Sequence, residues 1–361
     1  MQALKEVQRS QGGLFSDQGV LLSFGRDTDA RDTADLDTAA LAAASTGAVL
    51  VDRSHWGLIE LSGGDRLRFL HNQTTNTFTQ RQPGEGCNTV FVTSTARTID
   101  LATVYVTDDS LIMLTSPGQD QRLLDWMDRY IFPADQVALK NLTGEFALFS
   151  LMGPDSLAVL AKSGIDVQPD LPLAHHSVVD LKGTALRVAQ GSGLNLPGYT
   201  LLVPAVAAVQ VWQALAAAGA ALAGDALWQQ LRIMQGYPVP GAELTDDYNP
   251  LEAGLWQTIS FDKGCYIGQE TIARLNTYQG VKQQLWGIEL TAPVAVGTPI
   301  TVGDDKVGLL TSVVATATGA RGLGYIRTKA GGAGLAVTVG AASGVTVDVP
   351  FLSRGYLNVA G

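Results

Sequence analysis

One cysteine lies in a segment whose composition suits a reactive thiol. Cys265 belongs to residues 263–270, which read KGCYIGQE, and Gly264 and Gly268 permit backbone conformations that other residues avoid. A helix is predicted directly after this segment, so the thiol would lie near Lys263 and a positive helix N-terminus. Such surroundings make a cysteine more nucleophilic or more easily oxidised. The alternative is a small, buried and inert cysteine, the more common fate of a single cysteine.

A second group of candidates carries charge. Asp100 interrupts the β-prone residues 98–106, where an outward-facing strand position would explain it without any function. Four further charges in the irregular part of the chain could line a polar cleft or could simply be solvated: Arg232, Glu243, Asp246 and Asp247. Residue types alone leave the role of these side chains open.

Common catalytic motifs are absent from the sequence. There is no G-x-x-x-x-G-K-[ST] loop for nucleotide phosphates and no G-x-S-x-G elbow for a serine nucleophile. Residues 191–193 lack the third glycine of a dinucleotide fingerprint. The histidines form no i,i+4 pair and no Cys-x-x-Cys occurs, so no dedicated metal site is expected. Hydrolase, kinase and dehydrogenase chemistry is therefore disfavoured.

Composition indicates a multidomain globular protein. The chain has 361 residues, of which 46% are apolar and 16% charged, enough for two or three domains with large cores. Its formal charge of −10 would repel nucleic acid, so no direct nucleic-acid partner is expected. The two distant cysteines and the absence of a signal-like start favour the cytoplasm. Residues 201–224 carry no charge, but proline, glutamine and many alanines favour a strand and a packed helix over a membrane span.

The pattern along the chain predicts three regions. Residues 1–46 are expected to form a loosely attached N-terminal arm with one short helix. Residues 47–280 alternate short strands and helices, which is typical of packed α/β units. From residue 281 on, Thr, Val and Gly dominate and short apolar runs recur between glycine turns. A C-terminal barrel or sandwich is therefore predicted, with a boundary near Gly280.

The motif at 263–270 resembles the signature of the YgfZ family, folate-binding proteins linked to iron–sulfur cluster assembly or repair and to tRNA modification. Four stretches and the terminal β domain also resemble the aminomethyltransferase (glycine cleavage T-protein, GcvT) superfamily: residues 49–73, 98–100, 231–241 and 250–255. The resemblance implies an α+β fold, a three-part cloverleaf. Two interleaved α/β parts in residues 47–280 would be followed by a C-terminal β-barrel in residues 281–361.

The resemblance also implies site residues. In the transferases an aspartate at the position of Asp100 lies beside the reactive nitrogens of folate and is tied to catalysis. Asp100 and Cys265 are therefore the candidate catalytic residues. The remaining candidates are the other motif residues and the expected folate contacts: Lys263, Gly264, Tyr266, Gly268, Gln269 and Glu270, and Tyr199, Thr200 and Arg232.

Several positions depart from the transferase pattern. A glutamate that grips the pteridine through paired hydrogen bonds is replaced by Thr200, whose single hydroxyl cannot make that contact. The carboxylate of the usual Arg-x-Glu is replaced by Met234. Each lost charged contact would weaken folate binding about ten- to hundredfold. Transferases tend to have an acidic residue and Phe where Cys265 and Tyr266 stand, so the cysteine favours the YgfZ branch.

Three functions follow from the resemblance. The first is a cytoplasmic YgfZ-like protein that holds a tetrahydrofolate-type ligand and supports iron–sulfur proteins or their assembly factors. The second is an enzyme, a tetrahydrofolate-dependent aminomethyltransferase that takes a one-carbon unit from an aminomethyl-lipoyl carrier. The third is a ligand-binding scaffold without chemistry. Because folate is an anion, a positive mouth is expected from four residues: Lys263, Arg274, Arg232 and Lys282.

Overall fold

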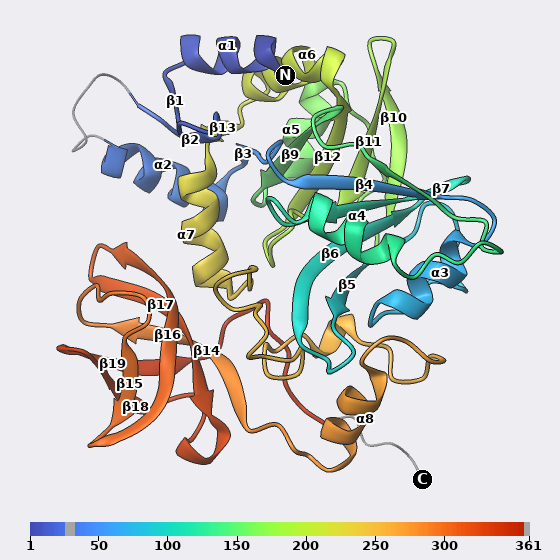
Figure 1. Ribbon diagram of the computed structural model, residues 1–361. Helices are drawn as coiled ribbons and strands as arrows, with labels where there is room; N and C mark the ends of the chain where they lie inside the picture. The colour runs from blue at the N-terminus through green and yellow to red at the C-terminus, as the bar shows by residue number, and fades with distance from the viewer. Residues whose placement is uncertain (26–32, 357–361) are drawn as a thin grey trace. The chain divides into compact units, whose positions relative to one another are not determined.

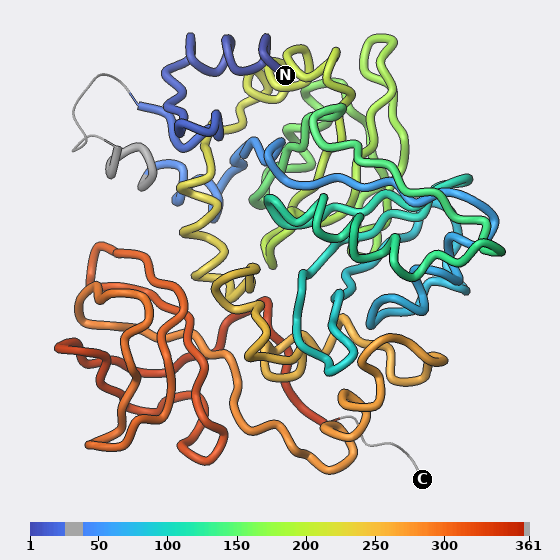
Figure 2. Tube along the Cα trace, in the orientation of Figure 1, coloured from blue at the N-terminus to red at the C-terminus, as the bar shows by residue number. Residues whose placement is uncertain are grey.

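The computed structural model describes residues 1–25 and 33–356 and, for residues 33–38, the backbone alone. The chain divides into two compact units, each assembled from several stretches of chain that can be followed by colour in Figure 2. Unit 1 contains Met1–Arg66, Arg81–Cys87 and Thr103–Leu231. Unit 2 contains Leu67–Gln80, Asn88–Ala102 and Arg232–Gly361.

Unit 1 begins with two helices and a hairpin: α1 (Gln2–Ser10), β1 (Gly13–Phe15), β2 (Leu21–Phe24) and α2 (Thr33–Thr46). Leu4 and Leu21 are buried in the main core of unit 1. The Nε2 atom of Gln8 donates a hydrogen bond to Asp52 Oδ2 at 2.8 Å. The prediction of a loosely attached arm is therefore wrong for the described residues, because this segment buries apolar side chains in the core. Residues 26–32 of the predicted arm lie outside the described residues.

A six-stranded sheet in the order β10-β11-β12-β9-β3-β13 forms the centre of unit 1 (Figure 1). Its strands are β3 (Val49–Asp52), β9 (Phe146–Met152), β10 (His176–Leu181), β11 (Thr184–Gln190), β12 (Gly198–Pro204) and β13 (Ala221–Ala223). Only the pair of β13 and β3 is parallel among these neighbours. β9 reads FALFSLM and is buried after its first residue, as expected for a strand that is covered on both faces.

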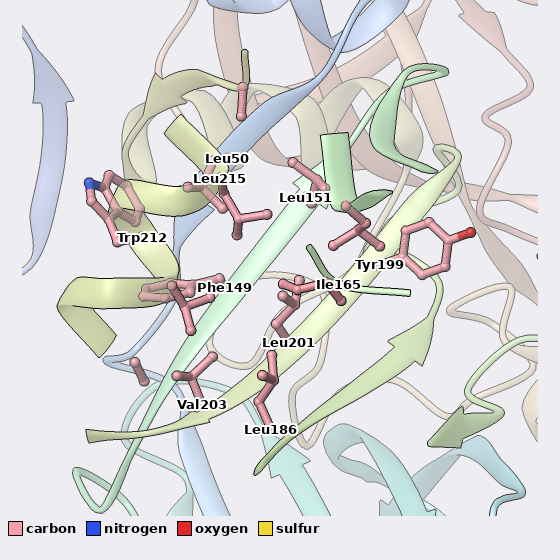
Figure 3. Packing of buried hydrophobic residues seen from close by; sticks show 14 of the residues in the cluster. Leu50, Phe149, Leu151, Ile165, Leu186, Tyr199, Leu201, Val203, Trp212 and Leu215 are labelled. Carbon is pink, nitrogen blue, oxygen red and sulfur yellow. The ribbon is translucent and has the colours of Figure 1, made fainter. Parts of the chain in front are cut away.

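Two helices pack against this sheet, α5 (Ser156–Ser163) and α6 (Ala208–Ala217), and both contact β12. Figure 3 shows Phe149 of β9 beside Trp212 of α6, with ring centres 5.4 Å apart, and Leu201 of β12 in the same core; all three side chains are fully buried. The uncharged residues 201–224 thus contain a strand and a packed helix, as predicted. No helix in the described part of the chain is long and apolar enough to cross a membrane.

A second sheet has the order β5-β6-β7-β4-β8. Its strands are β4 (Gly57–Ser62), β5 (Gly86–Val92), β6 (Thr98–Val106), β7 (Ser110–Thr115) and β8 (Ala138–Asn141). The helices α3 (Arg66–Gln73) and α4 (Asp120–Asp128) belong to the same stretch of sequence, and α4 packs on β4 and β8. The division between the units falls within β5, β6 and α3, so each of these elements contributes residues to both.

The C-terminal strands of unit 2 close into a barrel in the order β14-β17-β16-β15-β18-β19. They are β14 (Gln283–Leu290), β15 (Pro299–Val302), β16 (Asp305–Thr316), β17 (Gly319–Arg327), β18 (Ala336–Val339) and β19 (Ala342–Val347). Ile288, Leu310 and Ile326 lie in its core and are fully buried. The predicted C-terminal barrel is confirmed, and its first strand begins at Gln283, close to the boundary predicted near Gly280.

The connecting segments contain the remaining helices. These are α7 (Asp225–Gln235), α8 (Gln269–Thr277) and three short 3-10 turns, η1 (Ala205–Ala207), η2 (Trp256–Thr258) and η3 (Thr328–Ala330). The division between the units also falls within α7. Residues 263–268 lead directly into α8, so the predicted helix after the cysteine motif is confirmed.

Candidate functional site

Lys263, the first residue of the motif at 263–270, is buried rather than solvated. Its Nζ donates hydrogen bonds to the backbone oxygens of Thr74 at 2.7 Å and Asn76 at 2.6 Å, and to that of His71. His71 is in the last turn of α3, and Thr74 and Asn76 follow its end, where a helix leaves acceptors unpaired and its dipole is negative. Lys263 therefore caps α3 with a buried positive charge. Burial and this charge together lower the pKa of His71.

Tyr266 anchors the middle of the motif in a small core. It is buried with Leu251, Trp256 and Ile272, and Lys263 Nζ lies 4.6 Å from the centre of its ring, a cation–π contact. Burial raises the pKa of the Tyr266 hydroxyl. The Tyr266 side chain thus stabilises the segment through packing, and the neutral phenol is its stable form.

The two motif glycines have different surroundings. Gly268 has a φ of +81°, and a Cβ added there would lie 2.8 Å from the backbone oxygen of Thr93. A residue with a side chain would be strained at this position in two ways, through its backbone and through that contact. Gly264 has no heavy atom within 4 Å of a Cβ built on it. Only Gly268, the N-cap of α8, is thus required by the geometry.

Cys265 is the exposed cysteine of the motif. The described chain holds both cysteines as thiols, Cys265 exposed and Cys87 buried. The alternative of a buried, inert cysteine is therefore wrong for Cys265. The helix α8 begins only at Gln269, four residues after Cys265, and the Lys263 ammonium is hydrogen-bonded to carbonyls next to α3. Both positive groups that the sequence placed beside the thiol are thus less directly available to activate it than expected. Its reactivity stays a prediction.

The last two motif residues are close to the start of α8. Gln269 Nε2 donates to the backbone oxygen of Lys263 at 3.4 Å, which closes the loop that carries Cys265. Glu270 is exposed in the first turn of α8, where a carboxylate complements the helix dipole.

Asp100 is fully buried in β6. Its Oδ1 accepts a hydrogen bond from the backbone N–H of Leu101 at 2.9 Å. The alternative of an outward-facing strand residue is therefore wrong. Burying a carboxylate costs folding free energy unless hydrogen bonds or an opposite charge compensate it. An aspartate in a buried strand position therefore calls for a structural or functional explanation.

Arg232 is held by protein groups within unit 2. Its guanidinium forms an ion pair with Glu243 at 3.2 Å and donates to Ser312 Oγ at 3.0 Å. Glu243 is fully buried and also accepts bonds from the hydroxyls of Thr311 at 2.7 Å and Ser312 at 2.6 Å. This network joins the polar loop to the barrel and explains Arg232 and Glu243 without a ligand.

The expected folate contacts in unit 1 are buried on β12. Thr200 Oγ1 donates to the backbone oxygen of Gly191 at 2.8 Å, and Tyr199 is buried beside it in sequence. Burial raises the pKa of Tyr105 to about 12, although Arg53, a hydrogen bond with Thr200, and Arg187 act in the opposite direction. Burial also raises the pKa of Tyr199. These hydroxyls are therefore neutral hydrogen-bonding groups.

Two cationic positions in unit 1, the buried Arg53 and the half-buried Arg187, are not indicated by the sequence. The guanidinium of Arg53 makes cation–π contacts with both Trp56 and Trp228, 4.5 and 4.1 Å from their ring centres. Arg187 Nη1 lies 2.6 Å from His176 Nδ1, and burial followed by the Arg187 charge lowers the pKa of His176 to about 4. Nothing in the sequence next to Arg53 signals this arrangement, because Trp228 is far away along the chain.

The residues expected to form a positive mouth separate into two kinds. Lys263 and Arg232 are buried and bonded to protein groups, whereas Arg274 and Lys282 are exposed. Among the described residues, no three His, Cys, Asp or Glu side chains gather as a possible metal site.

Comparison with known proteins places the chain in a family. The model of the GCVT N-terminal domain matches residues 13–263. The chain belongs to the GCVT family.

Individual relatives extend this assignment. The chain is 44% identical over 348 residues to a protein of Arabidopsis thaliana called "Putative transferase At1g60990, chloroplastic", covering 96% of this chain and 78% of that one. It is 29% identical over 273 residues to an aminomethyltransferase of Synechococcus elongatus, covering 73% and 72%. It is 28% identical over 316 residues to an aminomethyltransferase of Halothermothrix orenii, covering 84% and 88%.

A solved structure supports the fold. The glycine cleavage system aminomethyltransferase T from Bartonella henselae matches with a TM-score of 0.82 and 18% identity, covering 97% of both chains. The predicted α+β fold of the aminomethyltransferase type is therefore confirmed for this member of the GCVT family. Membership of the YgfZ branch and a cytoplasmic location stay predictions.

Proposed function

We propose that this GCVT-family chain binds a tetrahydrofolate-type cofactor and transfers a one-carbon unit as an aminomethyltransferase does. Family membership and the names of the relatives support this function over the YgfZ-like one. The observation that carries the proposal is the complete burial of the Asp100 carboxylate in β6. In this proposal Asp100 orients the folate and stabilises charge next to its reactive nitrogens.

The residues present fit such a cofactor in part. The carboxylate of Asp100 is an acceptor for N–H groups of a reduced pterin. Thr200 already donates to Gly191 and has no carboxylate, so it supplies no charged contact. Arg232 is paired with Glu243 and contributes to folding rather than to the cofactor. Folate binding is therefore proposed to depend on Asp100 more than on residue 200.

The proposal is tested by measuring ammonia release from an aminomethyl-lipoyl carrier with tetrahydrofolate. We expect release that requires both substrates and that falls about a hundredfold or more in Asp100→Asn. Asp246→Asn, an exposed loop carboxylate, is the matched control and is expected to retain the native rate. A native protein that releases no ammonia would contradict the transferase function.

A second candidate function is supported by Cys265. Its neighbours Lys263, Tyr266 and Gly268 are explained by capping, packing and backbone geometry, whereas the exposed thiol has no structural explanation. The proposed role is the YgfZ-like one, in which the protein supports iron–sulfur enzymes or their assembly factors through this thiol. An exposed thiol can form a bond with a partner, as this role requires.

This second role is tested in cells that lack the protein, by measuring iron–sulfur enzyme activity after complementation. Cys265→Ser is expected to fold normally and to fail, while Glu270→Gln, another exposed motif position, is expected to restore activity. Full rescue by Cys265→Ser would exclude a role of the thiol. If Asp100→Asn and Cys265→Ser are both silent, the third function, a scaffold without chemistry, is favoured.

A further inference from the structure

A charged cleft in unit 2 lies outside the motif at 263–270, and Asp100 is not among its lining residues. It has a volume of about 910 Å³ and is lined by Lys282 just before β14, by Arg327 at the end of β17 and by Lys329 of η3. Arg97 and Asp247 complete its other wall. This volume is within the range of small-molecule sites.

The cleft has an excess of positive charge in a chain whose formal charge is −10. Four cations line it, Arg97, Lys282, Arg327 and Lys329, against two carboxylates, Asp247 and Glu252. In the described part of the chain, none of these cations forms an ion pair. The local field therefore attracts anions although the whole protein repels them.

One of the two carboxylates, Glu252, is buried and hydrogen-bonded within the protein. Its Oε2 accepts the backbone N–H of Asn249 at 3.1 Å. Burial raises its pKa, with opposing contributions from hydrogen bonds to Asn249 and Gln283 and from the charges of Arg97 and Lys282. Asp247 is thus the one exposed carboxylate in the cleft wall, and its backbone oxygen accepts a bond from Arg97 Nη1 at 2.7 Å.

Backbone hydrogen bonds hold Lys282, the residue before β14, next to Thr328, whose neighbours in sequence are Arg327 and Lys329. Thr328 N–H donates to the Lys282 oxygen at 2.9 Å, and Thr328 Oγ1 donates to the Val281 oxygen at 3.0 Å. In the barrel register Gln283 is opposite Arg327. Lys282, Arg327 and Lys329 line the same cleft, so their like charges repel one another, and a bound anion would reduce that repulsion.

We propose that this cleft binds a small molecule that carries two or more carboxylate or phosphate groups, with Lys282, Arg327 and Lys329 as its cationic contacts. Several separated cations suit a multiply charged ligand better than a single charge, because each additional ion contact adds to the same binding event. The proposal does not depend on the one-carbon transfer proposed above.

The test uses inorganic pyrophosphate and citrate as probes in calorimetric titrations of the full-length protein at low ionic strength. The native protein is expected to bind at least one of them, and binding is expected to weaken as salt is added. The double variant Lys282→Gln with Arg327→Gln is expected to bind at least about tenfold more weakly. The matched control is Lys306→Gln, an exposed lysine on β16 outside the cleft, which is expected to bind as the native protein does.

Two results would overturn the inference. One is the absence of binding of both probes by the native protein. The other is an equal loss of binding in Lys306→Gln and in the double variant, since that would indicate general surface charge. Asp100→Asn is expected to bind the probes normally, so a failure of the transferase proposal is distinguishable from a failure of this one.

Discussion

The motif at 263–270 in unit 2 and the buried polar groups around β12 in unit 1 both contain candidate functional residues, yet they are built differently. In the motif, Lys263 and Gly268 stabilise a local segment, and Cys265 is left exposed. In unit 1, Thr200 is buried and bonded to a backbone oxygen, and Arg53 makes cation–π contacts with two indole rings. The conspicuous motif at 263–270 is thus mostly structural, whereas Thr200 and Arg53, which no motif marks, belong to a buried polar region.

The largest expected effect tests the structural role of the motif. Lys263→Met removes the cation that caps α3 and leaves the oxygens of Thr74 and Asn76 without their donor, so we expect a loss of about 3 kcal/mol in the free energy of unfolding. Urea unfolding followed by circular dichroism measures this loss. Lys282→Met, at an exposed position, is the control and should change the free energy by less than about 0.5 kcal/mol. Equal effects of the two substitutions would show that Lys263 is not a buried cap.

The two motif glycines provide a matched pair. Gly268→Ala introduces a Cβ at a φ of +81° and 2.8 Å from the Thr93 oxygen, so a destabilisation of about 2 kcal/mol is expected. Gly264→Ala meets no neighbouring atom and should be close to neutral. The stabilities of the two variants are compared through their midpoints of thermal unfolding. Equal midpoints for the two variants would be incompatible with the geometry described for Gly268.

The buried histidine of unit 1 predicts a pH dependence. The pKa of His176 is lowered to about 4 in the folded protein, below the ordinary value near 6.5 that it has when unfolded. Its contribution to stability is therefore present above about pH 6.5 and is lost as the pH falls toward 4. We expect native stability to decline more steeply over this window than that of His176→Gln, in which an amide oxygen can still accept from Arg187. If the free energy of unfolding changed with pH in the same way in the native protein and in His176→Gln, His176 would not be a buried neutral side chain.

The smallest effect is expected at β12. Thr200→Val keeps the shape of the side chain and removes the hydroxyl that donates to Gly191, which should cost about 1 kcal/mol in unfolding free energy. Chemical denaturation measures this cost. The control is Thr301→Val on the barrel, which removes a solvent-exposed hydrogen bond from the Thr301 hydroxyl to the Thr338 oxygen. A stabilised Thr200→Val protein would mean that the hydroxyl is kept for a ligand rather than for the fold.

Local sequence patterns were sufficient to predict part of the fold. The strand and helix in residues 201–224 followed from an uncharged, alanine-rich run, and the barrel that begins at Gln283 followed from its short apolar repeats. Both are decided by residues close together in sequence. The N-terminal segment was predicted wrongly because the burial of Leu4 and Leu21 depends on a core that is formed much later in the chain.

The site was less predictable for the same reason. The exposure of Cys265 and the burial of Asp100 depend on tertiary packing, and the sequence left both open. The capping role of Lys263 requires the position of α3, nearly two hundred residues earlier. The cleft joins Arg97 to Lys282 and Arg327, which no spacing rule connects. Candidate site residues within one short segment can be recognised from the sequence, whereas a site formed by residues from distant segments cannot.

The most direct test of the central proposal is a calorimetric titration of the native protein and of Asp100→Asn with tetrahydrofolate. We expect saturable binding by the native protein and binding at least about tenfold weaker in Asp100→Asn, because the buried carboxylate would be the main polar contact for the pterin. Thr200→Glu, which reintroduces a carboxylate on β12, shows whether the chain has lost a stronger contact. No binding by the native protein would contradict the account.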